Sequence, residues 1–386
     1  MPGFAARMDK VVGSATVAIT GKVAEMKAQG HDVIGFSVGE PDFDTPEHVK
    51  QAAKDALDAG HTKYTPGPGI PALREAIARY HQERNGIPAE AKHVIATPTK
   101  QAVAMSFLAL AGQGDEVILP DPAWVSYEPI TRWAEATPVP VPCSLEDGFK
   151  MRADAVAEAI TPKSRMILLN SPSNPTGAVN DPADIRGIVE LAEDHDLWIV
   201  SDEIYQELIY DGEHLSPASL PGGFDRTITI DGLSKSFAMT GWRTGWLVAP
   251  GPAFKQINKL QSHSVTMVTS FAQHGAVAAL NGPKDSVAQM HAAFTERRKV
   301  MVDGLNALPG VECPTPSGAF YAFPKFDTDD DNALCMRMIE EAHVAPTPGS
   351  AFGEMGKGCL RFSYATSVER IQEGLARMGR LLEVPA

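Results

Sequence analysis

Residues 231–246, DGLSKSFAMTGWRTGW, place a lysine and an arginine eight residues apart, directly after an apolar run. Lys235 stands between two serines just after the run Thr227–Ile230, and Arg243 lies in a Gly-Trp-Arg-Thr-Gly segment. An amine at the junction of a strand and a loop can form a Schiff base with an aldehyde cofactor, and a nearby guanidinium can hold the phosphate of that cofactor. A lone Ser-Lys pair would more simply be a surface lysine followed by a structural arginine, so the interpretation depends on the other segments.

Two further segments carry polar side chains directly after apolar runs. In residues 170–177, NSPSNPTG, two prolines stiffen a turn and would present Asn174 in a fixed direction. In residues 201–205, SDEIY, Asp202 follows a second apolar run, where a carboxylate could also serve as a turn or helix cap. Ligands bind at the carboxyl ends of strands in open α/β sheets, and these side chains are expected there.

Apolar runs and helical patterns alternate along the chain, which predicts a mostly parallel α/β sheet. The predicted strands are His93–Thr97, Glu116–Leu119, Arg165–Asn170, Leu197–Ser201, Thr227–Ile230 and Gly245–Val248. The predicted helices between several of them include Pro71–Asn85, Gln101–Leu110 and Pro182–His195. The stretches Pro324–Ala345 and Ser367–Leu382 are expected to form helices of a smaller unit.

The composition is that of an ordinary globular protein, and the chain is long enough for two domains. Of 386 residues 44% are hydrophobic and 21% charged, and no apolar run approaches the roughly 20 residues needed to span a bilayer. The net charge of −14 argues against a nucleic-acid partner. The four cysteines lie far apart and predict reduced thiols in a cytoplasmic protein, while the first 20 residues show no export signal. The acidic run Asp327–Asp331 lacks the glycine and closing glutamate of a calcium loop, and we expect no metal site.

Five segments, in order, resemble the signature of the class I (fold-type-I) pyridoxal-phosphate-dependent aminotransferases, most like the bacterial aspartate aminotransferase branch. They are VGEPDFDTP from Val38, NSPSNPTG from Asn170, SDEIY from Ser201, the lysine segment from Asp231 and RFSYA from Arg361. The resemblance implies a mostly parallel seven-stranded sheet flanked by helices, with a smaller α/β domain built from both chain ends. The domain limits implied are 1–47 for an N-terminal arm and part of the small domain, 48–295 for the large cofactor-binding domain and 296–386 for the small C-terminal domain.

The resemblance also implies a role for each matching residue around pyridoxal 5'-phosphate. Lys235 would carry the cofactor and shuttle the substrate α-proton. Asp202 would keep the pyridine nitrogen protonated, which makes the ring an electron sink. Asn174 and Tyr205 would hydrogen-bond the phenolic oxygen, and Trp124 would stack on the ring.

The phosphate site is expected to depart from the family pattern. Arg243 matches the phosphate-binding arginine, but residues 97–100 read Thr-Pro-Thr-Lys where the family usually has a pair of small residues, so Thr99 and Lys100 must serve. A serine often found three residues before the lysine is Gly232 here, and Thr99 or Ser234 could replace its hydroxyl. Tyr64 matches a tyrosine that reaches the phosphate of the neighbouring subunit, which implies a homodimer with shared active sites.

The resemblance gives the substrate contacts as well. Arg361 would grip the α-carboxylate and Gly39 would offer it a backbone N–H. Residues 263–274 contain no arginine or lysine, which taken alone favours a neutral substrate, yet GSATVA from Gly13 matches a branch in which a serine, a threonine and a lysine bind a distal carboxylate. The expected substrate-binding set is therefore Arg361, Gly39, Asn174, Trp124, Lys100, Ser14 and Thr16.

The sequence thus predicts an aminotransferase that moves the amino group of L-aspartate to 2-oxoglutarate, or to a smaller acceptor such as glyoxylate or pyruvate, by a ping-pong mechanism. The alternatives that stay open on the same fold are an aminotransferase for neutral or aromatic amino acids, and a carbon–sulfur lyase, a decarboxylase or a ring-forming synthase. A nicotinamide enzyme is disfavoured, because the G-x-G-x-x-A pattern at Gly67 follows no apolar strand.

Overall fold

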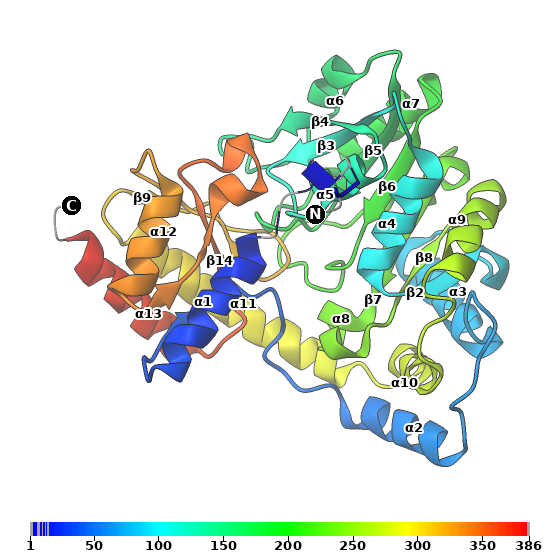
Figure 1. Ribbon diagram of the computed structural model, residues 1–386, viewed down its shortest axis with the longest axis horizontal. Helices are drawn as coiled ribbons and strands as arrows, with labels where there is room; N and C mark the ends of the chain where they lie inside the picture. Colours follow the sequence, from blue (N-terminus) through cyan, green and yellow to red (C-terminus); the bar gives the residue numbers. More distant parts are fainter. Residues whose placement is uncertain (1–2, 6–7, 10, 12, 14, 384–386) are drawn as a thin grey trace.

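A computed structural model of the chain describes residues 3–5, 8–9, 11, 13 and 15–383. Its centre is a seven-stranded sheet of order β2-β8-β7-β6-β5-β3-β4 (Figure 1). All neighbours pair in parallel except β8, which runs antiparallel to both β2 and β7. The strands are β2 (Val94–Thr97), β3 (Glu116–Asp121), β4 (Thr137–Pro142), β5 (Ser164–Asn170), β6 (Trp198–Asp202), β7 (Thr227–Gly232) and β8 (Gly245–Val248). The predicted mostly parallel α/β sheet is confirmed.

Helices cover both faces of the sheet, which explains why its strands are continuous apolar runs rather than alternating ones. Leu168 of β5 packs with α4 (Thr99–Leu110), α5 (Tyr127–Trp133) and α9 (Gly251–His263). Its neighbours Ile167 and Leu169 pack on the opposite face with α6 (Ala153–Ala159) and α7 (Pro182–Asp194). The opposite face of β2 and β8 packs on α3 (Pro71–Asn85) and α10 (Ser270–Asn281), with α2 (Glu47–Asp58) beside α10.

The edge strand β4 does not appear among the predicted strands. Pro138, Pro140 and Pro142 argue against a strand in the middle of a sheet, because proline cannot donate to the hydrogen-bond ladder. The strand pairs only with β3 and leaves its other side free, so its prolines are tolerated at this edge.

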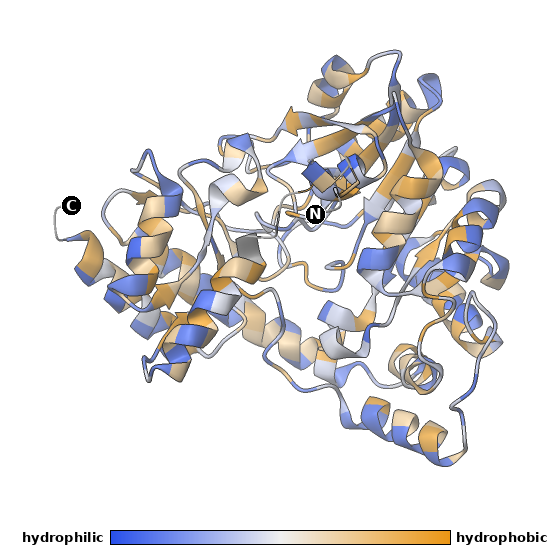
Figure 2. Ribbon diagram, viewed as in Figure 1, coloured by the Kyte–Doolittle hydropathy of each residue, from blue (hydrophilic) through white to orange (hydrophobic). Residues whose placement is uncertain are grey.

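A second core joins the two ends of the chain into the smaller unit, as predicted (Figure 1). It contains α1 (Ala15–Ala28), α12 (Asp331–Glu340), α13 (Val368–Leu382) and the short strands. The strand pairs are β1 (Ile34–Gly35) with β12 (Val344–Ala345), and β9 (Val311–Glu312) with β11 (Lys325–Phe326). The third group pairs β14 (Leu360–Ser363) with both β10 (Tyr321–Ala322) and β13 (Thr347–Pro348). Figure 2 shows α13 alternating between hydrophobic and hydrophilic residues, as expected for a helix with one face on a core.

The prediction of helix over Pro324–Ala345 is wrong at both ends. Asp330 caps the first turn of α12 by accepting a hydrogen bond from the Ala333 N–H, so the helix begins only at Asp331, the last residue of the acidic run. Residues before and after α12 belong instead to β11 and β12.

The long helix α11 (Asp285–Asn306) connects the two cores. Val287 packs in the core beside α3 and α10, whereas Phe294 and Leu305 pack in the core of the smaller unit. The domain limits 1–47, 48–295 and 296–386 stay a prediction. No helix in the described part of the chain combines the length and apolar character needed to cross a membrane.

Candidate active site

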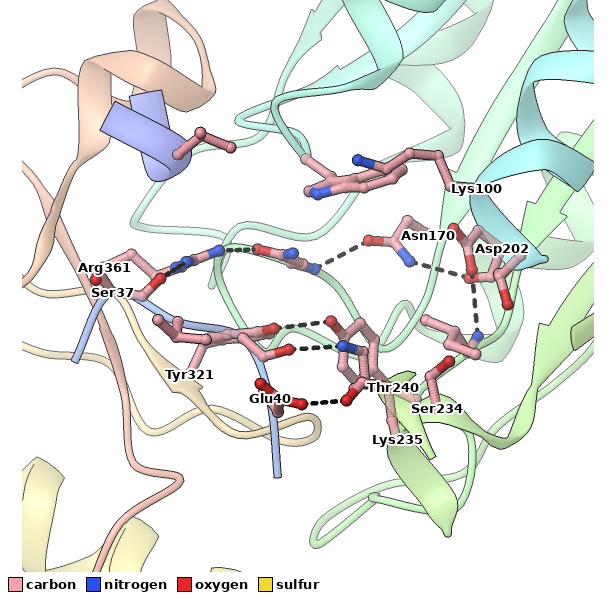
Figure 3. Close-up of a pocket in the computed structure, with 18 of the residues that line it drawn as sticks. Ser37, Glu40, Lys100, Asn170, Asp202, Ser234, Lys235, Thr240, Tyr321 and Arg361 are labelled. Carbon is pink, nitrogen blue, oxygen red and sulfur yellow. Dashed lines mark hydrogen bonds between the residues drawn. The ribbon is translucent and has the colours of Figure 1, made fainter. Parts of the chain in front are cut away.

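A pocket of about 650 Å³ opens where the smaller unit meets the carboxyl ends of β5, β6 and β7 (Figure 3). Parallel strands bring the polar residues that follow them to one edge of the sheet, and the smaller unit closes the pocket from the opposite side. Most of the predicted site residues line this pocket: Gly39, Thr99, Lys100, Trp124, Asn174, Asp202, Tyr205, Lys235, Arg243 and Arg361.

Lys235 lies in the short helix α8 (Leu233–Ser236) that follows β7. Its Nζ donates a hydrogen bond of 2.6 Å to the carbonyl oxygen of Gly39. Burial lowers the pKa of the amine to about 8, and the nearby carboxylate of Glu40 opposes that shift. Roughly a tenth of such an amine is neutral at pH 7, so it can act as a nucleophile or a base near neutrality.

Asp202 ends β6 with its carboxylate buried in the pocket wall. The hydroxyl of Tyr127 donates to its Oδ2 at 2.8 Å, and the Ile204 N–H donates to Oδ1 at 3.3 Å. Burial raises the pKa of this carboxyl to about 6 despite those hydrogen bonds. An N–H⁺ group beside Asp202 would return the carboxylate to its ionised form, because an opposite charge offsets desolvation.

Arg361 of β14 is a buried guanidinium on the opposite wall. Its Nη1 donates to Oδ1 of Asn174 at 2.8 Å and its Nη2 to the carbonyl of Ser37 at 2.5 Å, while its buried Nε has no hydrogen-bond partner. Among the described residues no carboxylate pairs with Arg361, and burial lowers its pKa. A buried cation held only by neutral acceptors is suited to binding an anionic ligand.

Thr99 and Gly232, the two positions that depart from the family's phosphate-site pattern, lie next to each other in space. Thr99 is the first residue of α4, and its buried Oγ1 has no hydrogen-bond partner. A Cβ atom at Gly232 would lie 2.7 Å from that Oγ1, and one at Gly245 would lie 2.3 Å from it. The Thr99 hydroxyl therefore occupies the region that a side chain at 232 would need. Arg243 faces the same pocket in a left-handed backbone conformation, with Nη1 donating to the Thr240 carbonyl at 2.8 Å.

Lys100 follows Thr99 in the first turn of α4. Its Nζ lies 4.7 Å from the centre of the Trp124 ring, a distance suited to a cation–π contact. Burial lowers the pKa of the amine, with a smaller contribution from Arg243. No acidic side chain pairs with Lys100 in the described part of the chain.

Of the remaining predicted residues, only Tyr64 has a described side chain, and it is not brought to this pocket. Ser14 and the side chain of Thr16 lie outside the described residues. Tyr64 is 88% exposed and does not line the pocket. Its predicted contact is with a neighbouring subunit, which a single chain does not test.

Several pocket residues received no role from the sequence, although Asn170 was expected at the ligand-binding edge of the sheet. Asn170 orients two neighbours: its Nδ2 donates to the Asp202 carbonyl at 3.0 Å and its Oδ1 accepts from the Asn174 N–H at 2.9 Å. Its place at a strand end was a usable signal. Tyr127, Ser37 and Tyr321 carry no comparable signal, because their contacts come from elements far apart in the sequence.

In the described part of the chain no group of three or more histidine, cysteine, aspartate or glutamate side chains could hold a metal ion. Two residues of the acidic run 327–331 make structural hydrogen bonds instead, and the first of them, Asp330, caps α12. Asp331 accepts hydrogen bonds from the N–H and the hydroxyl of Ser350, at 2.9 and 2.7 Å.

Comparison with known proteins agrees with this geometry. The sequence pattern described as aminotransferase class I and II matches residues 31–378. The probable aspartate/prephenate aminotransferase of Aquifex aeolicus is 42% identical over 391 residues, which are 99% of each chain. The aromatic-amino-acid aminotransferase 2 of Thermococcus litoralis is 42% identical over 364 residues, 92% of this chain and 93% of that one.

Among solved structures, the aspartate aminotransferase of Thermus thermophilus with maleate superposes with a TM-score of 0.95 at 40% identity. The match covers 99% of this chain and 100% of that one. The lysine in α8 after β7, the carboxylate at the end of β6 and the buried arginine facing them therefore occur in a chain that belongs to the class I and II aminotransferases, a family of pyridoxal-phosphate enzymes.

Proposed function

We propose that this aminotransferase moves the amino group of L-aspartate to a 2-oxo acid, either 2-oxoglutarate or a smaller acceptor such as glyoxylate or pyruvate, in two ping-pong half-reactions. One observation carries the proposal. Arg361 and Lys100 line the same pocket as Lys235, and neither has a carboxylate partner among the described residues. A dicarboxylic amino acid would supply an anion to each cation. The aspartate aminotransferases among the relatives support this choice.

The pocket residues fit pyridoxal phosphate. The orphaned Thr99 hydroxyl, the N-terminus of α4 and Arg243 offer donors and positive charge for a phosphate. The buried Asp202 carboxylate offers a partner for a pyridine N–H⁺. The full set that we propose to hold the cofactor is Lys235, Asp202, Tyr205, Asn174, Trp124, Thr99, Lys100 and Arg243, with Tyr64 reaching the site of a neighbouring subunit.

The proposed mechanism assigns binding and proton transfer to separate groups. Arg361 and the Gly39 N–H would hold the substrate α-carboxylate, which fixes the α-carbon beside Lys235. When bound, pyridoxal phosphate supplies an electron sink for the electron pair left at that carbon. The Lys235 amine would take the α-proton, and its lowered pKa lets it act as base and then as acid near neutral pH. The buried pocket wall would exclude competing water.

Lys100→Ala tests the substrate assignment. We expect the half-saturation concentration for L-aspartate to rise about 30- to 150-fold, since losing a partly desolvated charged contact costs roughly 2–3 kcal/mol. L-alanine has no distal carboxylate, so its half-saturation concentration should change little. Single half-reactions, followed by the visible absorbance of the cofactor, measure both values without the second substrate.

A matched control shows whether the loss comes from the Lys100 charge or from removing any lysine. Lys92→Ala removes a surface lysine that pairs with Glu90, and aspartate kinetics should be unaffected. Cofactor affinity of Lys100→Ala, measured by titrating the apoenzyme, shows whether the phosphate loop is intact. Equal losses for aspartate and alanine would mean that Lys100 serves only the cofactor and not the substrate, and the dicarboxylate assignment would then fail.

One observation favours a second candidate, an aminotransferase for aromatic amino acids. The pocket contains Trp124 and apolar side chains such as Val17 and Val103, and a relative with that name is 42% identical. Including L-phenylalanine in the same half-reactions decides between the two. A preference for phenylalanine that survives Lys100→Ala would support the aromatic reading.

We further propose a homodimer in the cytoplasm. A tyrosine as exposed as Tyr64, at a loop beside the sheet, is suited to burial against a second copy of the chain. All four cysteines are free and buried, which fits a reducing compartment. Sedimentation that returned only the 41.3 kDa monomer would contradict the dimer.

A further inference from the structure

Tyr321 of β10 reaches from the smaller unit into the pocket (Figure 3). There it meets Tyr205, which follows β6. The two hydroxyl oxygens lie 2.8 Å apart, and both side chains are buried. The position of the Tyr321 hydroxyl is confined, because a Cβ atom at Gly39 would lie only 2.3 Å from it. The absence of a side chain at Gly39 thus leaves the space that this hydroxyl occupies.

The direction of this hydrogen bond follows from the proposed function. Each tyrosine hydroxyl has one proton to donate. If Tyr205 donates its proton to the phenolic oxygen of the cofactor, the bond between the two tyrosines must use the proton of Tyr321. Burial raises the pKa of both hydroxyls, most strongly that of Tyr205, so both remain protonated. Successive hydrogen bonds polarise one another, and a hydroxyl that accepts one becomes a stronger donor.

The ring of Tyr321 has a separate contact. The guanidinium carbon of Arg361 lies 4.7 Å from its centre, within the range of a cation–π interaction. One side chain therefore contacts the proposed carboxylate-binding arginine through its ring and Tyr205 through its hydroxyl. These two contacts can be removed separately.

We infer that Tyr321 is a positioning residue whose hydroxyl donates to Tyr205 and strengthens the hydrogen bond that Tyr205 gives to the phenolic oxygen of the cofactor, while its ring supports Arg361. The inference rests on the proposed function. A weaker bond from Tyr205 would leave more negative charge on that oxygen, and this charge would hold a proton more tightly on the nearby Lys235 nitrogen.

The test is a pH titration of the visible absorbance of the cofactor-loaded enzyme. Tyr321→Phe should raise the titration midpoint by roughly 0.3–1 pH unit, the effect of weakening one hydrogen bond, and by less than Tyr205→Phe does. In a Tyr205→Phe background, Tyr321→Phe should cause no further shift, because the two residues act in series. Tyr364→Phe is the matched control: it removes a buried hydroxyl of the same core that donates to the Ala319 carbonyl, and the midpoint should not move.

Binding of maleate tests the ring. Tyr321→Phe keeps the ring and should bind maleate like the parent enzyme, whereas Tyr321→Leu should bind it several-fold more weakly. If Tyr321→Phe folds poorly, 3-fluorotyrosine at position 321 gives a nearly isosteric, stronger donor and should lower the midpoint instead. An unchanged midpoint, or an equal shift in the Tyr205→Phe background, overturns the inference and leaves the proposed function intact. The proposed function is tested separately by Lys235→Ala: if this variant kept the visible absorbance of the cofactor, the role of Lys235 would fail whatever the Tyr321 variants show.

Discussion

Lys235→Ala is expected to lower turnover with any amino acid by at least roughly 100- to 10,000-fold, the contribution of a positioned general acid–base group. The loss should exceed that range if the lysine is also the covalent anchor, because both functions then disappear together. The variant should also lose the visible absorbance that borohydride fixes permanently in the parent enzyme. Half-reaction kinetics and peptide mass mapping after borohydride reduction measure the two effects.

Lys284 provides the matched control for this experiment. It is also a partly buried lysine whose pKa is lowered by burial, and its Nζ lies 4.9 Å from the Phe237 ring, but it does not line the pocket. Lys284→Ala should retain the absorbance, the borohydride label and turnover. A label found on any lysine other than Lys235 would contradict the assignment.

The central sheet could be predicted because burial on both faces leaves a simple pattern in the sequence. Runs such as Met166–Leu169 are wholly apolar and end in polar residues, so both the strand and the edge that carries the site can be recognised. The strand β4 lacks that signal, since an edge tolerates prolines that a central strand would not.

The membership of the pocket was predictable where a motif ties a residue type to a strand end, as for Lys235 and Asp202. It was not predictable for Tyr321, which reaches Tyr205 across 116 residues of sequence and depends on the missing side chain of Gly39. The pairing of Thr99 with Gly232 is similar. Each residue alone departs from the family pattern. Only the close approach of α4 to the end of β7 shows that the Thr99 hydroxyl fills the space that a side chain at position 232 would need.

Burial changes the pKa of Asp202, and this pKa decides whether the carboxyl is charged when the cofactor binds. In the protein alone, desolvation raises its pKa to about 6, so below that pH the carboxyl is mostly protonated and neutral. A pyridine N–H⁺ held against it would favour the ionised carboxylate, and each unit of pKa difference corresponds to about 1.4 kcal/mol of interaction. Tyr127, which donates to the same carboxylate, carries no charge itself and so has a smaller effect than a pyridine N–H⁺.

Asp202→Asn is therefore expected to lower the rate of the amino-acid half-reaction by roughly 30- to 5000-fold, since removing one charge of a buried pair costs roughly 2–5 kcal/mol. The amide keeps the size of the side chain but cannot hold a proton on the pyridine nitrogen, so the cofactor should still bind through Lys235 and the phosphate site. Tyr127→Phe should cost far less, because the charge remains. Asp202→Glu should recover part of the loss, because it restores the charge with displaced geometry.

Pre-steady-state absorbance gives the half-reaction rate and titration of the apoenzyme gives cofactor affinity. Near-normal rates in Asp202→Asn would show that the ring needs no charged partner here, and a loss confined to cofactor affinity would make Asp202 a binding residue alone.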